Sequence, residues 1–126
     1  MTTKSTIVFI VDDDVSARTG LGRLVRAAGH DARLYDDSST FLSEVCQMPN
    51  GCIVLDVRMP GLAGSSLQEE LASRGISMPV VIVTADEDPG TRHRARQAGA
   101  VAFFRKPVDG PALLDAIDWA VGERKQ

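Results

Sequence analysis

The stretch CIVLDVRMPG, residues 52–61, changes character in its middle. Its first half is a run of apolar residues, which indicates a β-strand buried on both faces. The run stops at a carboxylate, Asp56, and Pro60 follows four residues later. We therefore expect Asp56 to lie at the rim of a sheet, at the point where the chain turns sharply away from it.

Four further apolar runs have a similar length and are rich in branched residues, so the chain is expected to contain five strands. Together with the run at 52–56, they cover residues 6–11, 31–35, 79–84 and 100–104. The first, third and fourth are apolar at successive positions, as is typical of strands covered on both faces. The second is mixed and is expected nearer an edge of the sheet.

Helical patterns separate these strands. Residues 16–28 form an amphipathic pattern with Arg18 among its polar positions, and Gly29 is placed to end the helix. Further helices are expected after a cap at Ser38 or Ser39, around Leu67 and Leu71, over the nearly all-polar residues 91–98, and from about Pro111.

The alternation of strands and helices predicts an α/β fold. We expect a single doubly wound (βα)5 domain over residues 1–126, with a five-stranded parallel sheet between helices. Its predicted arrangement is flavodoxin-like, with strand order 2-1-3-4-5. In such sheets a ligand site lies at the carboxyl ends of the strands, near the point where the direction of the crossovers reverses.

Composition narrows the possible functions. The 126 residues, 44% hydrophobic and 25% charged, suit one compact core. The formal net charge of −3 gives no basis for direct contact with nucleic acid. No apolar run approaches the length of a membrane span and no signal peptide is evident, so a cytoplasmic protein without membrane contact is expected. Cys46 and Cys52 form no metal-binding pattern and are expected to be buried or half-buried thiols.

Polar residues stand where the predicted strands end. They are Asp12, Asp13 and Asp14 after the first strand, Asp56 at the end of the third, Thr84 at the end of the fourth and Lys106 after the fifth. Because parallel strands end at one rim, these side chains should converge. Clustered carboxylates repel one another unless a cation lies among them, and Mg²⁺ prefers such oxygen ligands.

A pocket of this kind suits a phosphoryl group. A carboxylate can be the nucleophile in phosphoryl transfer, forming an acyl phosphate, when a metal and an ammonium group neutralise the transferring oxygens. We assign the nucleophile to Asp56, the ammonium to Lys106 and a hydroxyl donor to Thr84. Each residue alone has an ordinary explanation as a turn, cap or surface residue. Their joint occurrence at four strand ends supports the prediction.

Over essentially its whole length the sequence resembles the receiver domain of two-component response regulators, most closely those of the transcription-regulator type. The resemblance rests on IVDDD at 10–14, LDVRMPGLAG at 55–64, VTA at 83–85 and AGAVAFFRKP at 98–107. It implies a cytoplasmic phosphoprotein of a phosphorelay, with a sensor histidine kinase or a phosphotransfer protein as its partner. Such a domain is a phosphoacceptor that assists its own phosphorylation and dephosphorylation, and is not a turnover enzyme.

The resemblance also implies roles for individual residues. Asp56 would be the phosphoacceptor, taking the phosphoryl group from a phosphohistidine. Asp13, Asp56 and the main-chain carbonyl of Arg58 would hold Mg²⁺. Asp12 would act mostly through metal-bound water, and Lys106 would contact a phosphoryl oxygen. Asp14 is not expected to be a ligand.

A switch is implied in the same way. Thr84 would move toward the phosphoryl oxygens and Phe103 would turn inward, which would change the surface of the fourth helix, fifth strand and fifth helix. The alternative for Phe103 is an ordinary core residue. The bond from Lys106 to Pro107 is expected to be cis.

The same surface could pair two activated copies, because basic residues of the fourth helix face acidic residues of the fifth. The residues concerned are Arg92, His93, Arg94 and Arg96, with Asp115 and Asp118. A solvated face is the alternative reading. Many relatives of this type continue into a DNA-binding domain, so the chain could be either a full-length protein or the receiver part of a longer one with a DNA-binding output domain.

Two other functions compete with the receiver. Asp12, Asp14 and Ser16 mimic the D-x-D-x-[ST] opening of a haloacid-dehalogenase-like phosphatase. Against that enzyme, the chain has no evident second acidic pair after the fourth strand and no cap segment for a substrate. The second alternative is a receiver-shaped interaction module that is never phosphorylated, and the intact set of acids argues against it.

Overall fold

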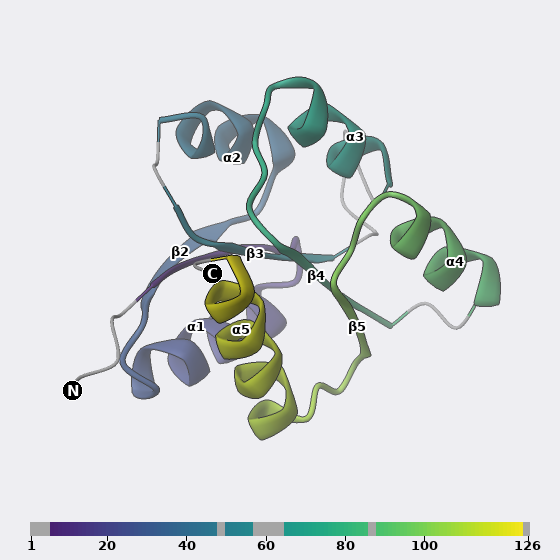
Figure 1. Cartoon of the computed structure of the whole chain (residues 1–126). Coiled ribbons are helices and arrows are strands. Elements are labelled where there is room, and N and C mark those ends of the chain that lie inside the picture. Colours follow the sequence, from purple (N-terminus) through teal and green to yellow (C-terminus); the bar gives the residue numbers. More distant parts are fainter. Residues whose placement is uncertain (1–5, 48–49, 57–64, 86–87, 125–126) are drawn as a thin grey trace.

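The computed structural model describes residues 6–47, 50–56, 65–85 and 88–124 (Figure 1). Strands and helices alternate along this part of the chain, as predicted. The strands are β1 (Ile7–Val11), β2 (Asp31–Tyr35), β3 (Cys52–Asp56), β4 (Val80–Thr84) and β5 (Ala102–Arg105). The helices are α1 (Val15–Ala27), α2 (Ser38–Val45), α3 (Ser65–Ser73), α4 (Pro89–Gln97) and α5 (Gly110–Arg124).

All strand pairs in the sheet are parallel, and their order is β2-β1-β3-β4-β5. This confirms the predicted topology and the edge position of β2. In the pairing register Val11 lies opposite Leu55, and Asp56 lies opposite Val83. The carboxyl ends of β1, β3 and β4 are therefore level with one another.

The helices cover both faces of the sheet. Figure 1 shows α1 and α5 on one face and α2, α3 and α4 on the other. Side chains of each strand alternate between two hydrophobic clusters, so Phe9 packs toward α2 and α3 while Ile10 packs toward α1 and α5. Every residue of β3 and β4 is buried. This double burial explains why these strands are continuous apolar runs rather than alternating ones.

Some predicted boundaries need correction, most by one or two residues. Strand β5 begins at Ala102 and not at residue 100, because the N–H of Ala100 donates to the carbonyl of Ala95, 3.0 Å away, and so still belongs to the end of α4. The cap of α2 is Asp37, whose Oδ1 accepts from the N–H of Thr40 at 2.8 Å, and not Ser38 or Ser39. Three successive residues that all suit a cap made this position ambiguous in the sequence.

Other local predictions can be compared directly. Gly29, with φ of 92°, follows the end of α1 as predicted. Cys52 is buried, whereas Cys46 is exposed, which corrects the expectation that both thiols are at least half-buried. Within the described residues, none of the helices has the length and apolar character that crossing a bilayer requires.

Candidate functional site

Three carboxylates meet at the rim of the sheet, beside the ends of β1 and β3. One oxygen from each of Asp12, Asp13 and Asp56 lies within 4.8 Å of the others. Asp12 and Asp56 are buried and Asp13 is exposed. The crossover after β1 leads to β2, and the one after β3 leads to β4 on the other side. The cluster therefore lies at the switch point, where the diverging crossovers leave the rim open.

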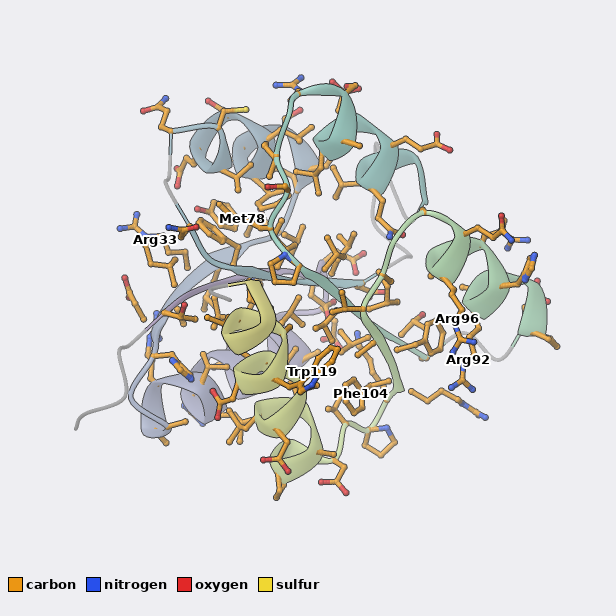
Figure 2. All side chains as sticks on the ribbon, viewed as in Figure 1. Arg33, Met78, Arg92, Arg96, Phe104 and Trp119 are labelled. Carbon is orange, nitrogen blue, oxygen red and sulfur yellow. The ribbon has the colours of Figure 1, made fainter. Side chains whose placement is uncertain are left out.

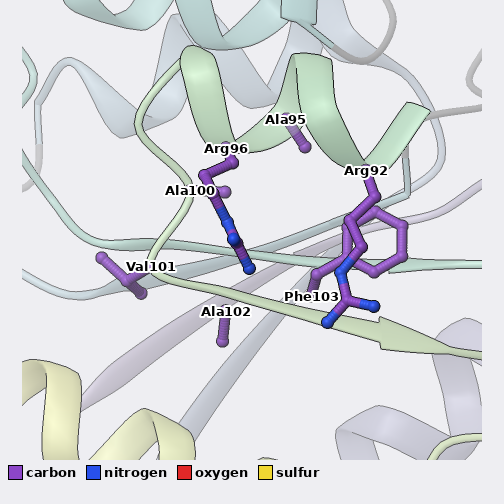
Figure 3. Close-up of a pocket in the computed structure, with 7 residues that line it drawn as sticks. All are labelled: Arg92, Ala95, Arg96, Ala100, Val101, Ala102 and Phe103. Atoms are coloured by element: carbon purple, nitrogen blue, oxygen red, sulfur yellow. The ribbon is translucent and has the colours of Figure 1, made fainter. Parts of the chain in front are cut away.

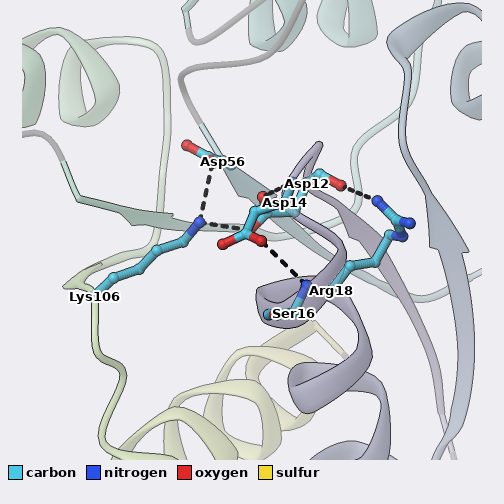
Figure 4. Close-up of polar contacts among 6 residues, drawn as sticks. All are labelled: Asp12, Asp14, Ser16, Arg18, Asp56 and Lys106. Carbon is cyan, nitrogen blue, oxygen red and sulfur yellow. Dashed lines mark hydrogen bonds and ion pairs between the residues drawn. The ribbon is translucent and has the colours of Figure 1, made fainter.

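Lys106 joins two of these acids. Its Nζ lies 2.7 Å from Oδ2 of Asp12 and 3.1 Å from Oδ2 of Asp56 (Figure 4). Its main-chain N–H donates to the carbonyl of Thr84 at 2.8 Å, which holds the residue beside β4 just after β5 ends. The peptide bond from Lys106 to Pro107 is cis. The ammonium group of Lys106 thus lies within a cup formed by Asp12, Asp13, Asp56 and Lys106, which come from distant parts of the sequence.

The charges in the cup influence one another's protonation. Burial raises the pKa of Asp12, and the nearby charge of Asp56 acts in the same direction, against the hydrogen bonds from Lys106 and the N–H of Asp14. Burial acts to lower the pKa of Lys106, but the hydrogen bonds and charges of Asp12 and Asp56 outweigh it and the pKa is raised. The ammonium therefore stays charged at neutral pH, in a cup where acids outnumber bases.

Asp12 is held on every side. Its N–H donates to the carbonyl of Tyr35 on β2 at 3.0 Å, and its Oδ1 accepts from the N–H of Asp14 at 3.0 Å. Its main-chain carbonyl accepts from Nη1 of Arg18 at 2.8 Å (Figure 4). Asp14 itself caps α1, with Oδ1 accepting from the N–H of Ser16 at 3.1 Å. Sequence reasoning missed the contact of Arg18, since a polar position on a helix gives no signal for a bond to a particular carbonyl.

The donor set suits a magnesium ion. Three carboxylates are hard oxygen ligands, and Asp13 on the exposed side leaves room for the waters that Mg²⁺ retains. Oxygens bound to one Mg²⁺ lie roughly 3 to 4 Å apart. The three carboxylate oxygens lie within 4.8 Å of one another, which is close to the spacing in a formed magnesium site. Arg58, whose carbonyl was predicted as a further ligand, lies outside the described residues, as does Pro60.

The residues predicted to form the switch lie farther along the sheet. Thr84 is buried at the end of β4, and Phe103 on β5 is half-buried. The guanidinium carbon of Arg92 lies 5.5 Å from the centroid of the Phe103 ring. Arg92 and Phe103 line a small pocket of about 40 Å³. Figure 3 shows this pocket between α4 and β5, with Arg96 on its other side.

Comparison with known proteins assigns this arrangement to a family. The family described as response regulator receiver domain matches residues 8–118, which include the acids, Thr84, Phe103 and Lys106. The chain belongs to this family. The predicted resemblance is thus confirmed, and the receiver domain is a component of two-component signalling. The family match favours the receiver over the phosphatase alternative.

Curated relatives show the same relationship. The receiver domain is 36% identical over 121 residues to the response regulator protein TmoT of Ectopseudomonas mendocina, covering 96% of this chain and 55% of TmoT. It is 39% identical over 111 residues to nodulation protein W of Bradyrhizobium diazoefficiens, covering 88% of this chain and 49% of that protein. The chain therefore spans about half the length of the curated relatives that it matches.

Solved structures confirm the fold. The receiver domain superposes on full-length FixJ from B. japonicum with a TM-score of 0.90 at 33% identity, over 96% of this chain and 60% of FixJ. It superposes on the response regulator StyR with a TM-score of 0.87 at 44% identity, over 98% of this chain and 64% of StyR. A CheY-like receiver from Methanospirillum hungatei, only 21% identical, shares the fold with a TM-score of 0.88.

Proposed function

We propose that this receiver domain is a phosphorylation-dependent switch that accepts a phosphoryl group on Asp56. The donor would be the phosphohistidine of a sensor histidine kinase or phosphotransfer protein. The observation that carries the proposal is the contact of Lys106 with both Asp12 and Asp56 inside a cluster of three carboxylates. This placement puts an ammonium group between the proposed nucleophile and a proposed metal-binding acid, where it can neutralise a phosphoryl oxygen on Asp56.

The reaction proposed is a transfer between two nucleophiles. A carboxylate oxygen of Asp56 attacks phosphorus, the bond from phosphorus to the donor's imidazole nitrogen breaks, and its electron pair stays on the imidazole. Lys106 would neutralise one phosphoryl oxygen. Asp12, Asp13, Asp56 and the carbonyl of Arg58 would hold Mg²⁺, which when bound supplies further positive charge for the transferring oxygens. Hydrolysis of the acyl phosphate would return the carboxylate.

A groove beside the cup suits the approach of the donor. It measures about 710 Å³ and runs from Lys106 and Pro107 along α1, where Leu21 and Leu24 line it. Val15, at the start of α1, is 62% exposed. Apolar surface next to a charged reaction centre is what a helical protein partner would need to dock and present its histidine.

We propose that phosphorylation changes the surface formed by α4, β5 and α5, and that this change is the output signal. Thr84 would move toward the phosphoryl oxygens and Phe103 would follow it inward. Figure 2 shows Arg92 and Arg96 leaving α4 in the direction of β5. A change in Phe103 would therefore rearrange a basic surface that could pair with acidic residues of α5, such as Asp115, in a second copy.

A larger protein and a cytoplasmic location belong to the same proposal. Several relatives are named transcriptional regulatory proteins, and the chain covers about half of each. This supports an output domain, outside the present sequence, as the part that reads the switch. The receiver domain would then not touch DNA itself.

The test is phosphoryl labelling. Incubation with Mg²⁺ and a small acyl-phosphate donor, followed by intact mass measurement, is expected to give one phosphoryl group per chain. Labelling should vanish in Asp56→Asn and persist in Asp115→Asn, an exposed acid of α5. Catalytic turnover of the donor that survives Asp56→Asn but is lost in Asp12→Asn would overturn the proposal in favour of a phosphatase. Failure of every donor, including histidine kinases, would favour the unphosphorylated module.

A further inference from the structure

We propose that Arg18 is a positioning residue for the metal site. Its hydrogen bond to the Asp12 carbonyl would hold the peptide that joins Asp12 to Asp13, and so keep the Asp13 carboxylate directed at the ion. The inference rests on the proposed function, because it assigns a role toward the proposed magnesium site. Arg18 contacts neither the ion nor the phosphoryl group in this scheme.

The peptide geometry explains how a carbonyl contact can aim a side chain. The carbonyl of Asp12 and the nitrogen of Asp13 belong to one planar unit. Nη1 of Arg18 lies 2.8 Å from that carbonyl oxygen, and the N–H of Asp12 is bonded to Tyr35 on β2. The peptide units before and after the α-carbon of Asp12 are thus both held. The next peptide, between Asp13 and Asp14, is held through the N–H of Asp14, which donates to Oδ1 of Asp12 at 3.0 Å. The two peptides on either side of the α-carbon of Asp13 together set the direction in which its side chain leaves the main chain.

Asp13 needs such indirect support more than its neighbours do. Lys106 and the N–H of Asp14 hold the carboxylate of Asp12, and Lys106 also holds that of Asp56. Among the described residues, the carboxylate of Asp13 has no hydrogen bond or ion pair, and the residue is exposed. Its main chain is what remains to orient it before an ion arrives.

Arg26 on the same helix offers a matched comparison. Its Nη2 donates to the carbonyl of Ala32 at 2.9 Å, so it makes the same kind of bond from α1 to the main chain. Arg26 lies in the last turn of α1 and Arg18 in its first half, next to the cup. Losing the Arg26 contact should affect the attachment of α1 to β2 without disturbing the acids.

If Arg18 acted only through its charge, its removal would change the Mg²⁺ affinity in the opposite direction. If Arg18 acted only as a nearby positive charge, its removal would relieve repulsion and strengthen Mg²⁺ binding. If it positions Asp13, its removal should weaken Mg²⁺ binding. The direction of the change therefore separates the two explanations.

The experiment is a calorimetric titration of the whole chain with Mg²⁺. Arg18→Met is expected to raise the dissociation constant about tenfold, as is typical for partners that orient metal ligands. Arg18→Lys keeps a donor and a charge and should recover most of the affinity, while Arg26→Met should stay within about twofold of the parent chain. An unchanged or tighter dissociation constant in Arg18→Met would overturn the inference. If Arg18→Met does not fold, Arg18→Gln, two bonds too short to reach the carbonyl, takes its place.

A second measurement distinguishes positioning from a general loss of structure. The rate of Asp56 labelling should need more Mg²⁺ for half-saturation in Arg18→Met, but should reach the same maximum, because Arg18 touches no reacting atom. A lower maximum at saturating Mg²⁺ would contradict the assignment. If the parent chain itself binds no Mg²⁺, the proposed function fails, which is a different outcome from failure of Arg18 alone.

Discussion

The guanidinium group of Arg92 on α4 covers the ring of Phe103 on β5, with 5.5 Å between the guanidinium carbon and the ring centroid. Cations over aromatic faces contribute about 0.5–1 kcal/mol at exposed sites. In the structure this contact stabilises the present position of the ring. In the proposed switch it must be given up when Phe103 turns inward.

Removal of that contact should favour the phosphorylated conformation. We expect Arg92→Met to bind beryllofluoride, an aspartyl-phosphate mimic, about two- to fivefold more tightly in the presence of Mg²⁺, because the ring moves without losing a cation contact. Arg96→Met, which changes the same charge at the same pocket, serves as the control. In a Phe103→Leu background the effect of Arg92→Met should disappear. A persisting effect would show that Arg92 acts through charge and not through the ring.

Magnesium should stabilise the fold. A ligand at ten times its dissociation constant adds about 1.4 kcal/mol, which for a chain of this size corresponds to a rise in Tm of roughly 5 °C. Asp13→Asn should lose most of this rise, yet melt slightly higher than the parent chain without Mg²⁺, because one clustered charge is gone. Differential scanning calorimetry with Asp115→Asn as the control checks both signs. A full response to Mg²⁺ in Asp13→Asn would remove that residue from the site.

The two thiols should differ in reactivity and in their effect on alkaline stability. Burial raises the pKa of Cys52 to about 12, whereas Cys46 is exposed. Well below pH 9, both the folded and the unfolded state keep the Cys52 thiol protonated. Between pH 9 and 12 only the unfolded state loses the proton, so the free energy of unfolding should fall as pH rises, on the order of 1 kcal/mol per pH unit.

Two measurements check this expectation. A thiol reagent at pH 8 should modify one cysteine in the folded chain and two after denaturation. Urea titrations between pH 8 and 11 should show a smaller loss of stability in Cys52→Ala than in the parent chain. Equal pH slopes would mean that Cys52 ionises normally in the fold.

Two glycines should respond to alanine in opposite directions. A Cβ on Gly51 would lie 2.6 Å from the carbonyl oxygen of Ile7 and 2.7 Å from the ring of Phe9, and the backbone atom cannot move aside easily. Gly51→Ala should therefore destabilise the fold by about 1–3 kcal/mol. A Cβ on Gly122 in α5 meets nothing within 4 Å, so Gly122→Ala should stabilise by about 0.5–1 kcal/mol. Chemical denaturation of both variants measures the difference.

Much of the fold could be predicted from the sequence because β3 and β4 are buried on both faces and leave continuous apolar runs. The convergence of Asp12, Asp56 and Lys106 could also be predicted, since parallel strands deliver their ends to one rim. Each of these inferences depends on the periodicity of a strand and on topology. Neither requires the position of an individual side chain.

The parts that escaped prediction depend on single hydrogen bonds. Because the N–H of Ala100 bonds to the carbonyl of Ala95, β5 begins later than predicted. Because the N–H of Thr40 bonds to Asp37, this residue is the cap of α2, although three successive residues suit that position. Arg18 could be assigned to a polar helix face, but its reach to the Asp12 carbonyl is set by the packing of α1 on β1 and β2. Such contacts are decided by distances of a few ångströms, which composition and spacing do not encode.

The ammonium group of Lys106 contacts two carboxylates, those of Asp12 and Asp56, before any phosphoryl transfer takes place. When Asp56 is phosphorylated, Lys106 would exchange a carboxylate partner for a phosphoryl oxygen. No new ion pair would have to be transferred from bulk water into the site. Electrostatic gains and losses at Lys106 would therefore largely offset one another in this exchange. In the proposed switch Lys106 would thus serve as the counter-charge both before and after phosphoryl transfer.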